Sequence, residues 1–337
     1  MSFTLTDLDR ASEIVRRSVP ATPAHRWPLL CEALGGDVWV KHENHTPTGA
    51  FKVRGGIVYV ERLLRERPEA RGLVSATRGN HGQSLAYAGG AAGLAVSICV
   101  PFGNSPGKNA AMRGFGATVV EVGHDYQAAR EHAAALAAER GFEYVPPFHP
   151  DLVLGVATYA RELFDAVADI DVVYVPVGMG TGASGLIGVR DLFGLPTEIV
   201  GVVSELAPAS ALSFAAGEVV STEFADTFVD GVACRVPDPQ AIETLVAGAS
   251  RVVAVSEDAT AAAMRLLFAA THNAPEPAGA ISLAGALAER DRIAGKRVAV
   301  VQSGGNVDSA MFADVLRGIT PVPAGAVERQ ASGQPAS

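Results

Sequence analysis

Short apolar runs rich in β-branched residues alternate along the chain with longer alanine-rich stretches. Most runs are apolar at every position, as expected of strands covered on both faces. This alternation predicts βαβ units around parallel sheets, and therefore an α/β protein. The predicted strands are 38–41, 73–76, 96–101, 118–122, 172–177, 199–204, 252–256 and 297–302, and the predicted helices are 80–93, 125–140, 154–167, 257–271 and 281–293.

Length and composition set the scale of the fold. With 337 residues, 48% of them hydrophobic, the chain can build one large domain or two moderate ones. The stretch 144–150 carries three prolines and is predicted to be a crossing between domains. The segment 321–337 is rich in Pro, Ala, Gly and Ser and is predicted to be a disordered tail.

Charge and cysteine usage exclude several classes of protein. Lys and Arg number 27 against 36 Asp and Glu, a net charge of −9, so nucleic acid is not expected as a partner. The sequence carries neither a signal-peptide pattern nor an apolar run long enough to span a membrane, which predicts a cytoplasmic protein. Cys31, Cys99 and Cys234 lie far apart, which argues against a disulfide framework or a cysteine-rich zinc site.

The segment TPTGAFKVRG carries the first candidate for chemistry. Pro47 and Gly49 mark a turn, and Thr48 is expected to cap a helix that begins near Ala50. Lys52 would then lie in the first helical turn, where the helix dipole favours the neutral amine that Schiff-base chemistry requires. The alternative is an ordinary surface lysine at a helix start.

The segment ATRGNHGQ follows a predicted strand and precedes a predicted helix. Thr77, Gly79, Asn80 and His81 would present a hydroxyl, a backbone N–H, an amide and an imidazole at the helix N-terminus. Such a terminus is suited to binding a carboxylate. A plain capped loop is the alternative.

Two further segments follow predicted strands. In VGMGTGASG, the residues Gly178, Gly180 and Gly182 would let the backbone approach a phosphate in front of the next helix. In VQSGGN, Ser303 would lie at the carboxyl end of a buried parallel strand, where open α/β sheets bind ligands.

Two functional interpretations fit these segments. Gly180, Gly182 and Gly185 spell GxGxxG, and Glu205 follows the next predicted strand, as in nicotinamide-dependent oxidoreductases. That interpretation gives no role to Lys52. A pyridoxal-phosphate enzyme needs an amine, a phosphate loop, a partner for the pyridine nitrogen and a carboxylate site, and the four segments offer one of each.

These motifs identify a family resemblance. From about residue 15 to about residue 318 the chain resembles the fold-type II (tryptophan synthase β-like) pyridoxal-phosphate enzymes, in the branch of serine/threonine dehydratases (threonine ammonia-lyases) and serine racemases. TGAFKVRG resembles the branch's lysine motif, GNHGQ its substrate loop and SGGN its pyridine-nitrogen motif, and PEPAGA and VSED also match.

The resemblance implies a fold and a reaction. It implies two α/β domains with twisted, parallel-type sheets: a large cofactor-binding domain of residues 1–70 and 151–320, and a small inserted domain of residues 71–150. A homodimer is usual in the family. The implied reaction removes water from a small β-hydroxy-α-amino acid of the L-threonine or L-serine type and yields a 2-oxo acid and ammonia.

The resemblance also implies roles for individual residues. Lys52 would hold pyridoxal 5′-phosphate as a Schiff base and then remove the substrate α-proton, with Phe51 packed on the cofactor ring. Asn80 would hydrogen-bond the ring's 3′-oxygen, and Ser303 the pyridine nitrogen. The phosphate would be bound by Gly178, Met179, Gly180, Thr181 and Gly182, and the substrate by Thr77, Arg78, Gly79, Asn80 and His81.

The sequence departs from the family pattern at three places. Arg78 follows Thr77 where the family has a small residue, which predicts little racemisation. Arg78 would pair either with a substrate β-carboxylate, as in 3-hydroxyaspartate, or with the protein; 3-phenylserine is another candidate substrate. The loop GMGTG is partly similar to the cysteine synthase branch, so β-replacement is an alternative reaction. Val203 stands where relatives carry a metal-binding acid, with Glu205 two residues on, so no metal is expected.

Overall fold

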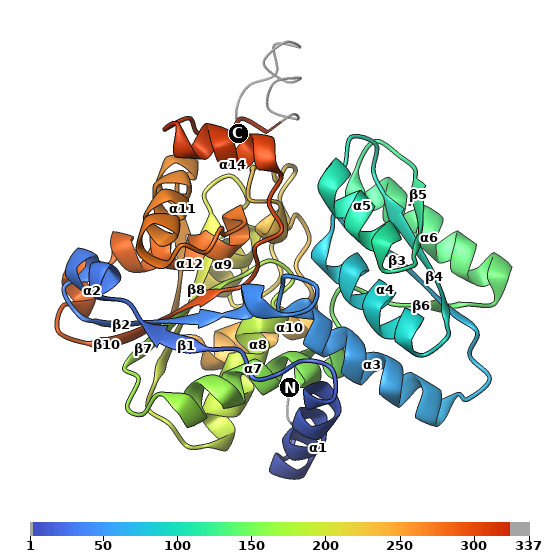
Figure 1. The fold of residues 1–337 in the computed structure, drawn as a ribbon, viewed down its shortest axis with the longest axis horizontal. Helices are drawn as coiled ribbons and strands as arrows, with labels where there is room; N and C mark the ends of the chain where they lie inside the picture. Colours follow the sequence, from blue (N-terminus) through green and yellow to red (C-terminus); the bar gives the residue numbers. More distant parts are fainter. Residues whose placement is uncertain (1–2, 324–337) are drawn as a thin grey trace. The chain divides into compact units, whose positions relative to one another are not determined.

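The structure, a computed structural model, describes residues 3–323 (Figure 1). Most of the segment 321–337, predicted to be a disordered tail, lies outside the described residues. The described chain forms two compact units. The first unit comprises residues 3–23, 43–166 and 184–195, and the second comprises residues 24–42, 167–183 and 196 onward. Each unit is built around a sheet of its own.

The second unit contains a six-stranded sheet in the order β1-β2-β10-β7-β8-β9. All neighbouring strands are parallel except β1, which pairs antiparallel with β2 at one edge. Because β10 and β7 are neighbours and parallel, the loops that follow them leave the sheet at the same edge. The strands are β1 (Ala24–Arg26), β2 (Asp37–His42), β7 (Val172–Pro176), β8 (Glu198–Ser204), β9 (Arg251–Val255) and β10 (Arg297–Gln302).

Helices of the second unit bury one face of this sheet. Alternate strand residues, among them Val40, Val202 and Val300, share a core with Ile281 and Leu283 of α12. The helices and 3-10 turn are α2 (Pro28–Leu34), α9 (Ala209–Ala216), η2 (Asp230–Val232), α10 (Pro239–Gly248), α11 (Glu257–Thr271), α12 (Pro277–Ala288), α13 (Arg290–Ile293) and α14 (Ser309–Leu316).

The first unit contains a parallel four-stranded sheet in the order β5-β4-β3-β6. Leu73 and Ile98 pack in a core with Leu85, whereas Val74 and Cys99 pack in another core with Ala133. The centre of the sheet is therefore apolar on both faces, which explains why β3 and β4 are almost entirely apolar in sequence. The strands are β3 (Gly72–Ala76), β4 (Ala95–Val100), β5 (Thr118–Glu121) and β6 (Glu143–Tyr144).

Helices α3 and α7 of the first unit pack closely together. A Cβ on Gly55 would lie 2.8 Å from the carbonyl oxygen of Leu152, and one on Gly155 would overlap the backbone of Arg54, so only glycine permits this approach. The helices and 3-10 turn are α1 (Leu5–Arg16), η1 (Glu43–His45), α3 (Lys52–Glu66), α4 (Asn80–Ala91), α5 (Pro106–Gly114), α6 (Tyr126–Arg140) and α7 (Pro150–Ala166); α8 (Thr181–Leu192) begins in the second unit and continues in the first.

The predicted α/β class and all eight predicted strands are confirmed. The short strands β1 and β6 were not predicted. The predicted helix 281–293 is wrong as a single element, because the helix stops before Glu289 and α13 follows. Glu289 instead accepts hydrogen bonds from Arg251 and Tyr174. The predicted boundaries of a small domain at 71–150 stay a prediction.

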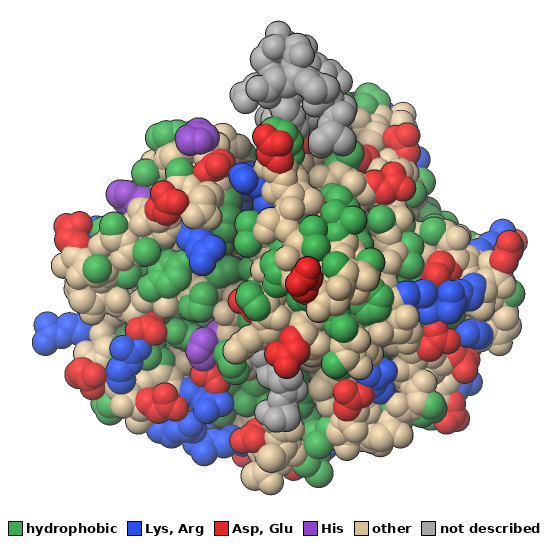
Figure 2. Space-filling model, turned by 180° about the vertical axis from the view of Figure 1, so that it is seen from behind, with side chains coloured by type: hydrophobic (Ala, Val, Ile, Leu, Met, Phe, Trp, Pro, Cys, Tyr) green, Lys and Arg blue, Asp and Glu red, His purple; other side chains and the backbone are tan. Residues whose placement is uncertain are grey.

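Surface charge and hydropathy add two observations. On the face shown in Figure 2, Lys and Arg side chains are interspersed with Asp and Glu. Among residues 3–323, no helix combines the length and the apolar character needed to cross a bilayer.

Cys31, Cys99 and Cys234 are all free thiols.

Candidate active site

Lys52 lies in the first turn of α3, as predicted, although the helix begins at Lys52 itself and not near Ala50. Its Nζ lies 4.9 Å from the centre of the Phe51 ring, and that ring packs edge-on against Tyr159. The expected cap by Thr48 is wrong: Phe51 occupies the N-cap position and makes no side-chain cap. Thr46 shapes the loop instead, because its hydroxyl accepts from the Ala50 N–H at 2.9 Å and donates to the Ala50 carbonyl at 2.8 Å.

The chain has four lysines, and they occupy different environments. Lys41 is fully buried within β2, and Lys108 is buried in α5. Lys296 forms an ion pair with Glu198 at 3.2 Å. Lys52 is the one that begins a helix beside an aromatic ring and stays partly exposed. These positions favour Lys52 as the amine available for covalent chemistry.

A buried ion-pair network lies beside Lys52, and no pattern in the sequence predicted it. Arg54 has no exposed surface and donates to Glu43 at 2.7 Å and to Glu162 at 2.8 Å. Its guanidinium also donates to the hydroxyls of Thr22 and Thr158. Burial alone would lower the pKa of Arg54, but the two carboxylates raise it above its usual range. The network fixes the first turn of α3.

The predicted substrate loop lies at the start of α4, as expected. Gly79 is the N-cap residue, and its N–H donates to the Thr77 hydroxyl at 3.0 Å. Asn80 and His81 are the first two helical residues. Arg78 is exposed, and no described residue hydrogen-bonds or ion-pairs with it. The structure thus shows no protein partner for Arg78 among these residues, and its role stays a prediction.

The predicted phosphate loop joins β7 to α8 in the second unit. Gly180 has φ +91°, a conformation that favours glycine, and Thr181 begins α8. Gly182 is the second residue of that helix. A Cβ on Gly178 would overlap the carbonyl oxygen of Gly231 in η2. The Sδ of Met179 lies 3.5 Å from the Sγ of Cys234.

Ser303 directly follows β10, as predicted, and is 3% exposed. Its hydroxyl donates to the carbonyl of Ala278 in α12 at 3.2 Å. The Glu276 N–H donates to the Gly304 carbonyl at 3.1 Å, and a Cβ on Gly279 would overlap that same oxygen. The start of α12, within the PEPAGA motif, therefore sets the position of Ser303.

The predicted site residues form two groups. The first unit holds Phe51, Lys52 and the residues from Thr77 to His81. The second unit holds the glycine loop and Ser303 at one edge of its sheet. Their assembly into a single site, and the role of each residue, stay predictions.

The structure gives two observations on metal binding. Val203 is fully buried, and Glu205 is exposed with its N–H bound to the Val255 carbonyl at 2.9 Å. No group of three or more His, Cys, Asp or Glu side chains placed to hold a metal ion occurs among residues 3–323.

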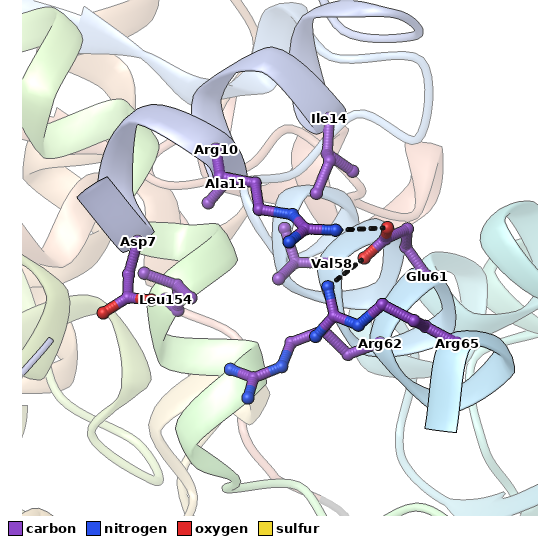
Figure 3. Close-up of a pocket in the computed structure, with 9 residues that line it drawn as sticks. All are labelled: Asp7, Arg10, Ala11, Ile14, Val58, Glu61, Arg62, Arg65 and Leu154. Atoms are coloured by element: carbon purple, nitrogen blue, oxygen red, sulfur yellow. Dashed lines mark ion pairs between the residues drawn. The ribbon is translucent and has the colours of Figure 1, made fainter. Parts of the chain in front are cut away.

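A surface pocket lies on the first unit, where residues of α1, α3 and α7 meet (Figure 3). Its arginines are matched by acids: Glu61 lies 3.6 Å from Arg10 and 3.8 Å from Arg65, and Arg62 pairs with Asp151 at 2.6 Å. None of the predicted site residues lines this pocket. The paired charges make it a structural ion-pair cluster rather than an anion site.

Comparison with known proteins adds independent findings. The model of the family described as "Pyridoxal-phosphate dependent enzyme" matches residues 15–304. The L-threonine ammonia-lyase of Thermotoga maritima is 32% identical over 315 residues, 93% of this chain and 78% of that protein. The L-threo-3-hydroxyaspartate ammonia-lyase of Saccharomyces cerevisiae is 29% identical over 94% of this chain and 97% of that protein.

The fold also matches a solved structure. The processed form of threonine deaminase isoform 2 from Solanum lycopersicum superposes with a TM-score of 0.85 at 27% identity, covering 94% of each chain. This likeness extends over both units.

Proposed function

Because the chain belongs to the pyridoxal-phosphate dependent enzymes, we propose that it is a dehydratase (ammonia-lyase) of β-hydroxy-α-amino acids. The substrate would be of the L-threonine or L-serine type. The Cα–H and Cβ–OH bonds break, water leaves, and the released enamine takes up water to give a 2-oxo acid and ammonia. The similarity to threonine and 3-hydroxyaspartate ammonia-lyases supports this reaction.

The observation that carries the proposal is the position of Lys52. It starts α3 with Nζ 4.9 Å from the Phe51 ring, while the other three lysines are buried or ion-paired. Pyridoxal 5′-phosphate supplies an aldehyde for an amine and an electron-withdrawing ring that stabilises negative charge at the substrate Cα. Lys52 would hold the cofactor and accept the α-proton at Nζ, and Phe51 would support the ring.

The second unit has the features that the phosphate and ring require. The glycine loop leads into the N-terminus of α8, where backbone N–H groups favour an anion. Gly178, Met179, Gly180, Thr181 and Gly182 would bind the phosphate.

Ser303 would face the pyridine nitrogen. Its hydroxyl, unlike a carboxylate, does not hold that nitrogen protonated, which favours loss of the β-hydroxyl over transamination. The start of α12 fixes its position, and the O–H that donates to the Ala278 carbonyl in the structure would turn to donate to the nitrogen. Asn80 would hydrogen-bond the 3′-oxygen.

The loop before α4 would bind the substrate carboxylate. Thr77, Gly79, Asn80 and His81 surround a helix N-terminus, whose dipole favours an anion. Arg78, exposed and unpaired among the described residues, supports a second candidate: a substrate with a β-carboxylate, of the 3-hydroxyaspartate type.

The domain boundaries, the cellular location and the oligomeric state are also proposals. We infer a small domain at residues 71–150, a cytoplasmic location and a homodimer. Sedimentation of the purified protein, with a dimer expected and a monomer as the contrary result, tests the oligomeric state.

A keto-acid assay tests the function. The cofactor-loaded protein is given L-threonine, L-serine, 3-hydroxyaspartate and 3-phenylserine, and 2-oxo acid and ammonia are measured together. We expect equal amounts of both products without an added thiol or nicotinamide. Product that forms only with a thiol would favour β-replacement of the cysteine synthase type, and nicotinamide-dependent turnover would favour an oxidoreductase.

A further inference from the structure

Glu257, in the VSED motif, has no role in the proposed function, yet its carboxylate accepts hydrogen bonds from three groups. It is the first residue of α11, where the helix dipole favours a negative charge. Its Oε1 accepts from the Ser204 hydroxyl at 2.5 Å and from the Thr227 hydroxyl at 2.8 Å, and its Oε2 accepts from the Phe228 N–H at 2.9 Å. Hydrogen bonds to an ionised acceptor are stronger than those between neutral groups. Glu257 therefore ties the end of β8 to the loop at Thr227.

From Thr227 the chain forms a tightly bonded segment, residues 227–234, that contains η2. The Val229 N–H donates to the Thr227 hydroxyl at 3.0 Å. The Val232 N–H donates to the Val229 carbonyl at 2.9 Å, and the Cys234 N–H donates to the Val232 carbonyl at 2.8 Å. Val229 and Val232 are also buried in the core that contains α12. A displacement at Thr227 would therefore be transmitted along the segment to Cys234.

The glycine loop after β7 contacts this segment at two neighbouring residues. A Cβ on Gly178 would overlap the Gly231 carbonyl oxygen, so the two backbones touch. The Sδ of Met179 lies 3.5 Å from the Sγ of Cys234. Because protein interiors are closely packed, a shift of the segment would displace both loop residues.

The same segment contacts the region that holds Ser303. A Cβ on Gly231 would overlap the Cβ of Ala278, whose carbonyl accepts from the Ser303 hydroxyl at 3.2 Å. Gly231 therefore packs between the glycine loop and the start of α12. The segment 227–234 thus sets the spacing between the two features that the proposed function assigns to the second unit.

We propose that Glu257 is a positioning residue for the cofactor phosphate: through the segment 227–234, its carboxylate holds Gly178 and Met179 in the conformation that binds the phosphate. This inference rests on the proposed function for the assignment of the phosphate to the glycine loop. The hydrogen bonds and the packing belong to the chain alone. Loss of the carboxylate leaves the N–H of the buried Phe228 without its acceptor, which is costly, so the segment must move. The glycine loop then moves with it.

Two substitutions of Glu257 and a matched control separate positioning from stability alone. Glu257→Ala removes every acceptor, whereas Glu257→Gln keeps one oxygen for the Phe228 N–H. Glu289→Ala is the control, because that carboxylate accepts from Arg251 and Tyr174 at the other end of α12. All three variants should lose stability in urea. We expect the Kd of pyridoxal 5′-phosphate, measured by absorbance titration, to rise about tenfold in Glu257→Ala, less in Glu257→Gln and not at all in Glu289→Ala. An unchanged Kd in Glu257→Ala, or an equal rise in the control, would overturn the proposal.

Carbon-13 NMR of the methionine methyl groups tests the packing without cofactor. The chain has five methionines, and the Met179 signal is assigned from its loss in Met179→Leu. We expect that signal to move in Glu257→Ala and to stay in place in Glu289→Ala. An unmoved signal in Glu257→Ala would overturn this inference alone, even in an active lyase. A moved signal with an unchanged Kd would overturn it together with the assignment of the phosphate to this loop.

Discussion

Arg54 and Glu43 form a salt bridge of 2.7 Å in which neither side chain has any exposed surface. The Arg54 guanidinium forms a second salt bridge, of 2.8 Å, with Glu162. The network lies two residues after Lys52 and ties the start of α3 to η1 and α7. The first turn of α3 is therefore held in place by ion pairs that are buried away from solvent.

Replacing Arg54 by methionine should destabilise the chain strongly. Glu43 and Glu162 would be left buried without their cation, which costs about 3–5 kcal/mol. Urea unfolding of Arg54→Met against wild type measures this loss. Arg317→Met is the control, since its exposed pair with Asp314 contributes about 0–1 kcal/mol. Equal losses in both variants would contradict the account of the network.

His81 should make stability depend on pH. The unfolded imidazole takes up a proton near pH 6.5, whereas the folded one does so only near pH 3. The stability contributed by the neutral imidazole is complete above pH 6.5 and is lost as pH falls toward 3. At pH 4.5 the loss is on the order of 3 kcal/mol. Urea midpoints between pH 8 and 4.5 should fall less steeply in His81→Asn than in the exposed-site control His132→Asn; parallel curves would count against the buried neutral histidine.

Gly279→Ala should disturb the Ser303 region. The new Cβ would overlap the Gly304 carbonyl oxygen, so α12 must shift, at a cost of about 1–3 kcal/mol. Cofactor affinity should fall with stability, because Ser303 depends on the same helix. Gly114→Ala, a helical glycine with no atom within 4 Å of its Cβ, is the control and should be neutral or slightly stabilising. Unaltered cofactor titration of Gly279→Ala would show that α12 does not position Ser303.

Arg78→Ala should change substrate ranking rather than abolish turnover. If the guanidinium binds a β-carboxylate, kcat/KM for 3-hydroxyaspartate relative to L-threonine should fall about tenfold. Arg78→Lys should lose part of that preference, because an ammonium lacks the planar fork. A constant ratio across wild type and both variants would remove the β-carboxylate hypothesis.

The pattern of the sequence predicted the strands that contain an apolar run, the edge strands β5 and β9 included, and missed two short edge strands that lack one. All eight predicted strands were recognised from their apolar runs. Ala24–Arg26 and Glu143–Tyr144 lack such a run and become strands because a sheet edge offers backbone partners. The start of α3 was misplaced because Thr46, rather than Thr48, satisfies the loop backbone.

The candidate site was predictable where a motif follows a strand. Lys52, Asn80, Thr181 and Ser303 lie at the helix starts and strand ends that their motifs indicated. The Arg54 network was not predictable, since Glu43 and Glu162 lie 11 and 108 residues away and no local pattern links them.

Borohydride reduction of the cofactor-loaded protein, followed by peptide mapping, tests the central claim most directly. The chain offers four lysines, so the result is unambiguous. The account predicts a stable pyridoxyl label on Lys52, and no label in Lys52→Met at the same cofactor concentration. A label on Lys41, Lys108 or Lys296 in its place, or an unlabelled wild-type chain, would contradict it.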